Sequence, residues 1–314
     1  MATPKSPTKE RIYAAAHFAL ELDGKQEVGL FRSVEGGSIK TDVMTYQNGA
    51  NYDRWRQLGK PKFEDVKVSV GMSMSEPFYK WIEEFFTGKG TRKTGAIVAA
   101  DYNYTSRARR EFSGALIKEL SFPKLDATDK SPAYMNIAFA VEDIKFKPGD
   151  GKTLQFIDEP EKQKAWTACN FRLKLDTFAS DTLLRVTKID SFTIKQNIIE
   201  HHMGGFRAPI KCPSQIDYPS LTFYIPEIDA QPFLERFHAH GVMGAKPGGL
   251  TGAIECFDND KSKNVLLTVS FSGAEISNVQ PEKSDSNSED VKLVKVEVFT
   301  ESMSFTYHAV KGAS

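Results

Sequence analysis

The sequence predicts a mainly β protein, a β-barrel or sandwich with one packed α-helix in each of two tandem domains. Three observations carry this prediction. Apolar and polar residues alternate with a period of two along much of the chain, an apolar stripe with helical spacing occurs once in each half, and short motifs of the first half recur in order in the second. A length of 314 residues also exceeds one ordinary domain and suits two.

The first half begins with an expected flexible arm, residues 1–15, which is rich in proline and basic side chains. Strand-type alternation starts at Phe18 and ends at Asp23-Gly24, a pair typical of a hairpin turn. A second candidate strand covers 39–46 and a third covers 66–70. Later candidate strands are expected at 96–102, 110–120 and 135–146.

One helix interrupts these strands. Its apolar residues have the i, i+3, i+4, i+7 spacing that places them on a single face, namely Phe78, Trp81, Ile82, Phe85 and Phe86. Ser75 suits the N-cap, Pro77 the first turn and Gly88 the position just beyond the end. The pattern predicts a core helix near 76–87 packed against the sheet.

The second half repeats these signals. Residues 18–22 (FALEL) correspond to 171–175 (FRLKL), and residues 112–115 (FSGA) recur letter for letter as 271–274. The helix start Pro77-Phe78 corresponds to Pro232-Phe233, which predicts a second helix near 230–240 with Phe233, Leu234 and Phe237 as its apolar stripe. These matches favour a tandem duplication; the alternative is two unrelated β-rich domains.

The repeat and the loop composition together predict the domain boundaries. The first domain is expected to cover 16–147 and the second, a diverged copy, 166–310. Between them, 148–165 is polar and carries glycine and proline, as a linker would. A second polar run, 282–290, is expected to be a mobile loop between strands.

Composition excludes several classes of protein. Lys and Arg number 41 and Asp and Glu also number 41, so the net charge of zero argues against a nucleic-acid binder with a broad basic face. Three cysteines without paired spacing (Cys169, Cys212 and Cys256) are expected to be reduced core thiols. No apolar run reaches the length of a membrane span, and residues 13–20 make a poor signal core because charged residues follow at once. We expect a soluble protein that is not exported by the general pathway.

The sequence offers no catalytic constellation. GxSxG, HExxH and Walker A patterns are absent from it. His238 and His240 are two apart on an expected helix and would point to nearly opposite sides, while His201 and His202 with Cys212 make only a weak zinc candidate. We therefore expect no catalytic, cofactor-binding or metal-binding residues, and a protein that is not an enzyme.

A basic run near the middle of the first half leaves two interpretations open. Arg107, Arg109 and Arg110 lie close in sequence to Asp101 and Glu111. They form either a solvated strand edge or a salt-bridging surface between subunits.

Four segments of the first half resemble the tail tube proteins of contractile phages and related injection systems. They are the opening strand HFALELDG, the polar loop YQNGAN…RQLGK between 46 and 60, the strand and helix over 66–88 that include Trp81, and the late strand over 112–125. The polar loop is the most specific of them, and the resemblance covers roughly 16–147. The second half departs from the pattern. Its counterpart loop, 200–219, carries three prolines and does not end with a basic residue followed by Leu-Gly, as the first loop does.

The resemblance implies a structural subunit of a phage or phage-like tail, located in the virion tail and assembled in the host cytoplasm. Sheets join edge to edge around a ring, and stacked rings form a channel for DNA or effectors. It further implies self-association, partners in the sheath, the baseplate and the tail terminator, passage of cargo without sequence-specific binding, and no membrane or cofactor. The contact loop between rings would comprise Tyr46, Gln47, Asn48, Gly49, Asn51, Arg54, Arg56 and Leu58.

Other interpretations stay open at this point. The chain could form the tube-initiating or hub ring at the baseplate, or be a β-sandwich that binds a receptor or glycan on the virion. Because rings of this kind usually hold six domains, a duplicated chain could close a ring with three copies or with six.

Overall fold

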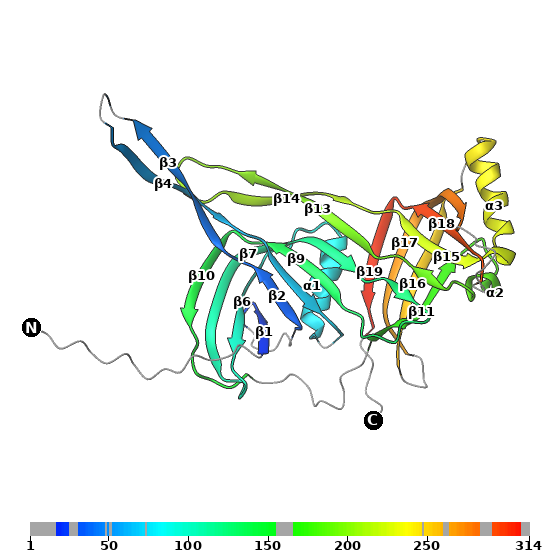
Figure 1. The fold of residues 1–314 in the computed structure, drawn as a ribbon, viewed down its shortest axis with the longest axis horizontal. Helices are drawn as coiled ribbons and strands as arrows, with labels where there is room; N and C mark the ends of the chain where they lie inside the picture. Colours follow the sequence, from blue (N-terminus) through cyan, green and yellow to red (C-terminus); the bar gives the residue numbers. More distant parts are fainter. Residues whose placement is uncertain are drawn as a thin grey trace, which may run out of the picture.

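The computed structural model describes residues 17–24, 31–47, 49, 52–72, 74–154, 166–246, 248–259, 264–282 and 291–308 (Figure 1). The expected arm at 1–15, Asn48, Asn51, most of the expected linker and nearly all of the polar run at 282–290 lie outside these residues. The described chain is mainly β, as the sequence predicts.

The first half is an antiparallel sheet with one helix. Its elements are β1 (His17–Leu22), β2 (Ser33–Gly36), β3 (Ile39–Gln47), β4 (Arg54–Phe63), β5 (Val66–Val70), α1 (Glu76–Phe86), β6 (Lys93–Ala100), β7 (Ser106–Phe122), β8 (Leu125–Asp126), β9 (Met135–Ala140) and β10 (Asp143–Pro148). The strand order is β1-β6-β7-β9-β5-β2, with β10 on the other edge of β7. Strands β3 and β4 form a separate hairpin.

The second half has the same plan. Its elements are β11 (Trp166–Leu175), α2 (Ser180–Leu183), β12 (Lys188–Ile189), β13 (Phe192–His201), β14 (Ile210–Asp217), β15 (Leu221–Pro226), α3 (Gln231–Phe237) with a π-helical turn (His238–Val242), β16 (Leu250–Asp258), β17 (Val265–Pro281), β18 (Leu293–Phe299) and β19 (Ser302–Tyr307). The strand order is β11-β16-β17-β18-β15-β12, with β19 on β17. Each strand of this order, and β19, has a first-half counterpart in the same place.

The two long central strands share a local irregularity. Strands β7 and β17 each span 17 residues. The glycine of the FSGA motif has φ of +65° in β7 (Gly114) and +61° in β17 (Gly273). A Cβ atom at either position would collide with a glutamate side chain, Glu142 or Glu301. The shared order and this shared detail agree with the repeat in the sequence, whose origin by duplication stays a prediction.

Helix α1 is buried on both sides. Trp81 is 2% exposed and donates from Nε1 to the carbonyl of Thr91 at 3.1 Å, and Phe78, Ile82 and Phe85 are also buried. The opposite face meets β19 of the second half, where Tyr79 stacks on Tyr307 with ring centroids 4.0 Å apart. The helix therefore packs against its own sheet, as predicted, and also joins the two halves.

Helix α3 buries less than the sequence predicts. Phe233 is fully buried and Phe237 is half-buried, but Leu234 is 41% exposed. The face toward β17 has Phe233, Arg236 and Phe237 at i, i+3 and i+4, so Leu234 at i+1 points away. Arg236 forms a bidentate ion pair with Glu275 of β17 at 2.8 and 2.7 Å.

The structure also corrects the expected linker and loops. The backbone N–H groups of Ser106 and Leu154 donate to the carbonyls of Lys152 and Tyr104, so the first unit continues to residue 154 rather than ending at 147. The segments expected as polar loops, 46–60 and 200–219, are largely strands of two long hairpins. The strand expected at 39–46 is confirmed as β3, whereas the start of β4 is exposed from residue 54 to 58 and has no buried face whose alternation the sequence could show.

We predict that Trp81→Ala lowers the free energy of unfolding by about 3–5 kcal/mol, because it leaves a large cavity beneath α1. Chemical denaturation followed by fluorescence measures the change. Lys80→Ala, on the exposed face of the same helix, is the control and should change stability by no more than about 0.5 kcal/mol. Equal stabilities of the two variants would contradict the packing described for α1.

We predict that Glu275→Gln destabilises the protein at pH 7 by about 2–4 kcal/mol, because it leaves Arg236 largely buried without its partner. Burial alone would raise the pKa of Glu275, but the hydrogen bonds from Arg236 and from the Ile276 N–H outweigh it and lower the pKa. A carboxylate with a lowered folded-state pKa contributes stability above its unfolded-state pKa and loses it as the pH falls.

The stability difference between wild type and Glu275→Gln should therefore shrink below about pH 4.5. Denaturation curves at pH 7 and at acid pH measure it. Glu227→Gln, at an exposed and weakly paired carboxylate, is the control. A difference that is independent of pH would show that the ion pair is not its source.

Candidate assembly surfaces

The hairpin of β3 and β4, which we call the first arm (residues 39–63), is an exposed projection from the first half (Figure 1). Large apolar side chains lie open on it: Val43 is 58% exposed, Trp55 68% and Leu58 60%. Solvent-exposed apolar groups gathered on one element are typical of an interaction surface. The expected contact residues that the structure describes all lie on this arm and are exposed, namely Tyr46, Gln47, Gly49, Arg54, Arg56 and Leu58.

The hairpin of β13 and β14, the second arm (residues 192–217), is anchored on the first half. The backbone N–H of Lys211 donates to Glu142 Oε1 at 2.8 Å, and Arg92 Nη2 donates to the carbonyl of Lys211 at 2.6 Å. The Lys211 side chain is 7% exposed, with Nζ 3.9 Å from Asp65. The second arm therefore crosses the domain to which it does not belong.

The two arms meet beyond this anchor. Arg207 of the second arm donates to the carbonyl of Gly59 in the first arm at 3.1 Å, and Figure 1 shows both arms extending on the same side of the molecule. Ile199 and Phe206 of the second arm are 57% and 62% exposed. The arms together present more apolar surface than either alone, a feature that neither hairpin sequence reveals.

The two halves are also joined by strand pairing. The start of β13 pairs antiparallel with the end of β7, with Thr193 opposite Ser121 and their hydroxyl oxygens 2.8 Å apart. Phe122 and Phe192 stack with centroids 4.8 Å apart. Next to this contact, β12 pairs with β8. We call this edge-to-edge contact the internal junction; sequence reasoning missed it, because pairing between distant strands leaves no local pattern.

The arginine run lies on the central strand β7 rather than at a strand edge, and its side chains make contacts within the first half. Arg109 makes a bidentate pair with Glu21, and both side chains are largely buried. Arg107 pairs with Asp101 at 2.8 Å, and Arg110 donates to the carbonyl of Gly36 at 2.9 Å. Hydrogen bonding by Glu21 is the main cause of the raised pKa of Arg109. These cations hold strands together within the chain.

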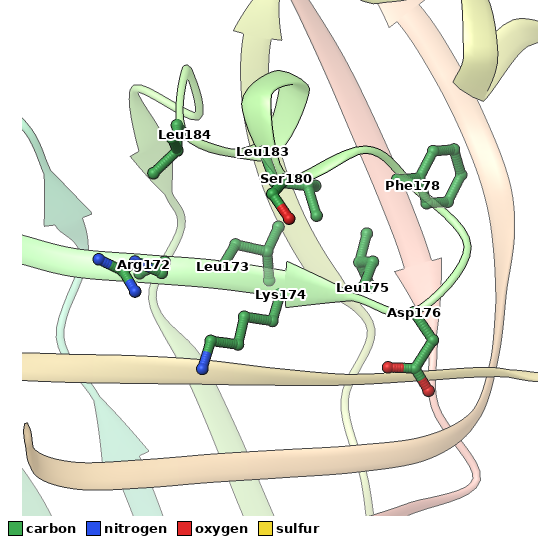
Figure 2. Close-up of a pocket in the computed structure, with 9 residues that line it drawn as sticks. All are labelled: Arg172, Leu173, Lys174, Leu175, Asp176, Phe178, Ser180, Leu183 and Leu184. Carbon is green, nitrogen blue, oxygen red and sulfur yellow. The ribbon is translucent and has the colours of Figure 1, made fainter.

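A groove of about 440 Å³ lies beside β11 in the second half (Figure 2). Leu173, Leu175, Phe178, Leu183 and Leu184 contribute apolar side chains to it. Its charged side chains are Arg172, Lys174 and Asp176. Lys174 Nζ donates a hydrogen bond to Glu255 Oε1 at 2.5 Å. We find no acid–base pair in this lining that would suit catalysis.

Within the described ranges, no group of three or more His, Cys, Asp or Glu side chains is placed to hold a metal ion. In that part of the chain, no helix has the length and apolar character needed to cross a bilayer. The three cysteines are free thiols, and burial raises the pKa of Cys256 to about 12.

Comparison with known proteins gives one family match. Residues 14–145 match the family model described as "T4-like virus tail tube protein gp19". No curated protein sequence matches the chain. The matched segment covers β1 to β10 almost completely, including the first arm and α1.

Solved structures similar to this chain are about half its length. One chain in the structure of the sheath–tube complex of an extracellular contractile injection system (PVC, extended state) is 18% identical to this protein. The match covers 47% of this chain and 99% of that chain, with a TM-score of 0.39. The tube-terminating cap of the anti-feeding prophage is 17% identical over 47% and 98%, with a TM-score of 0.38. An Hcp protein is 14% identical over 46% and 95%, with a TM-score of 0.28.

The family match coincides with the segment whose loop, helix and late strand resemble tail tube proteins in sequence. It confirms that resemblance for the first half and leaves the second half unassigned. Residues 14–145 of this chain are similar to the T4-like gp19 tail tube family.

Proposed function

We propose that the chain is a structural subunit of a contractile tail tube, in a phage or a phage-like injection system, that forms stacked rings around a central channel. The match of residues 14–145 to the tail tube family is the observation that carries this proposal. The edge-to-edge junction supports it, because the chain already joins one domain to another through open strand edges. In this role the protein is a building element of the virion tail rather than an enzyme.

The partners follow from that role. Copies of the chain bind one another, and sheath, baseplate and tail-terminator proteins bind the assembled tube. Cargo, whether DNA or protein, passes without sequence-specific binding, which agrees with a net charge of zero. Assembly takes place in the host cytoplasm and requires neither a membrane nor a cofactor.

Within this function, the tip of the first arm is proposed as the contact between stacked rings. Its exposed apolar residues, such as Trp55 and Leu58, would be covered by the next ring. A tube-initiating ring at the baseplate is the second candidate. The second arm favours this candidate. Its backbone is held against the first half at Lys211, so this part of the arm is not free to reach a neighbouring ring.

We predict that shortening the first arm prevents long tubes without unfolding the protein. Thr45 and Arg56 are paired across the hairpin, so replacing 46–55 with Asn-Gly keeps the register of the remaining strands. Negative-stain microscopy should show single or few stacked rings instead of rods, with an unchanged circular dichroism spectrum. Shortening the second arm outside its anchor, by replacing 202–209 with Asn-Gly, is the matched comparison. Undiminished rods after shortening the first arm would contradict its role in stacking.

We predict that a ring contains three chains and six tube-like domains. The same strand order in both halves supports this, because each half can then occupy an equivalent place in the ring. Native mass spectrometry of an isolated ring should give about 105 kDa for three chains of 35.1 kDa. A mass of about 211 kDa would instead indicate a ring of six chains, with the second halves outside it.

A further inference from the structure

The groove beside β11 lies along a strand edge that has no partner strand (Figure 2). Its lining comes from two neighbouring segments, residues 172–176 at the end of β11 and residues between 178 and 184 that include α2. Strand β11 is the last strand of its sheet and pairs with β16 on one side. In the described structure no strand pairs with residues 172–175 on the other side. The groove therefore has a strand edge as one wall and the α2 segment as the other.

The backbone of Leu173 faces away from β16. The N–H of Asp176 donates to the carbonyl of Thr251 in β16 at 3.0 Å, and in an antiparallel pair alternate residues bond to the same neighbour. Lys174 and Arg172 therefore also direct their N–H and C=O groups toward β16, and Leu173 between them directs its own outward. Among the described residues outside β16, no backbone group bonds to Leu173. One donor and one acceptor are thus open at this edge.

The first half covers the equivalent edge with its own chain. There the N–H of Phe31 donates to the carbonyl of Phe18 at 3.3 Å, and Phe31 is 8% exposed. In the repeat, Phe18 corresponds to Phe171, and Phe31 corresponds to Val186, since each lies two residues before a short strand, β2 or β12. The N–H of Val186 donates instead to Leu183, in the turn after α2. This turn keeps the second half from covering the edge of β11.

The α2 segment limits what can pair with this edge. Leu183 and Leu184 lie across from the end of β11, and the space between has a volume of about 440 Å³. A single extended segment fits such a groove, whereas the edge of another sheet would bring its neighbouring strands, about 5 Å further on, against α2. Because residues 172–176 form the strand wall, a bound segment would pair over about five residues.

The apolar side chains of the groove lie on one face of the strand. Figure 2 shows Leu173 and Leu175 on the side that faces Leu183, while the side chains of alternate residues lie on the opposite face. Leu184 is 63% exposed and adds apolar surface to the same side. A segment paired with β11 would therefore bury apolar side chains on this side at every second position.

The charged side chains lie on the other face and differ along the strand. Lys174 is paired with Glu255. Arg172 and Asp176, at the two ends of the groove, make no ion pair with a described residue, and the guanidinium of Arg172 lies over the ring of Phe257 at 5.2 Å. The groove thus has an available positive charge at one end and an available negative charge at the other.

We propose that this groove binds one extended segment of a different protein, which adds to β11 as an antiparallel strand. The bound segment has an acidic residue opposite Arg172, a basic residue opposite Asp176 and apolar residues opposite the two leucines between them. The open backbone groups of Leu173 supply main-chain hydrogen bonds, and the alternating lining supplies specificity. The site belongs to the second half and does not require the chain to form a tube.

Synthetic peptides test the pairing. The labelled probe SKVTVES, lying antiparallel to β11, places its lysine opposite Asp176 and its glutamate opposite Arg172. The peptide SVKTEVS has the same composition, but its charges face the leucines instead. Fluorescence anisotropy measures both dissociation constants, and we expect SKVTVES to bind at least about tenfold more tightly than SVKTEVS.

A charge reversal tests the register. Wild type should prefer SKVTVES to SKVTVKS, and Arg172→Glu, at an exposed position, should reverse this preference. Leu184→Glu, also at an exposed position, should weaken binding of SKVTVES about tenfold. Lys292→Glu changes an exposed cation outside the groove and is the matched control, which should bind like wild type.

Three results would overturn the inference: no saturable binding of SKVTVES, equal affinity for SVKTEVS, or an unchanged preference in Arg172→Glu. Loss of rings or rods in Leu184→Glu, with no peptide binding to wild type, would show that the groove is a contact between copies of this chain and would overturn it as well. None of these results would contradict the tube function, which microscopy of the wild-type protein tests separately.

Discussion

The fold depends on one long strand in each half that changes neighbours partway along. At Gly114 and Gly273 the backbone adopts a positive φ, next to a glutamate that leaves no room for a Cβ atom. Before this point β7 pairs with β6 and β10, and after it with β9 and β13. The edge that receives β13 exists because the strand continues past its first set of partners. The junction between the halves therefore depends on a position that only glycine can occupy without strain.

The sequence predicted the parts of the fold that have a buried and an exposed face. The alternation at 66–70 and the stripe from Phe78 to Phe86 record burial directly, so β5 and α1 lie where they were expected. The strand expected at 39–46 is β3, but the start of β4 was mistaken for a loop because residues 54–58 are all exposed and show no alternation of burial. Leu234 was assigned to the core because the sequence does not show that Arg236 would bind Glu275.

The candidate surfaces were predicted less completely, for a related reason. The resemblance of 46–60 to a known loop identified the first arm, including Tyr46 and Leu58, and the family match covers it. The contact of Ser121 with Thr193 in the internal junction and the contact of Arg207 with Gly59 join residues 72 and 148 positions apart. Such contacts are set by topology rather than by local composition. The arginine run was misassigned for the same reason, since its partner Glu21 lies on a distant strand.

The internal junction also imposes an order on folding during synthesis. The ribosome completes β7 well before it makes Phe192–Lys195, and domains commonly fold as they emerge. During that interval the strand that pairs with the end of β7 has not yet been made. The linkage of both halves in one polypeptide favours the correct partner, because the tethered strand is present at a far higher effective concentration than a separate chain.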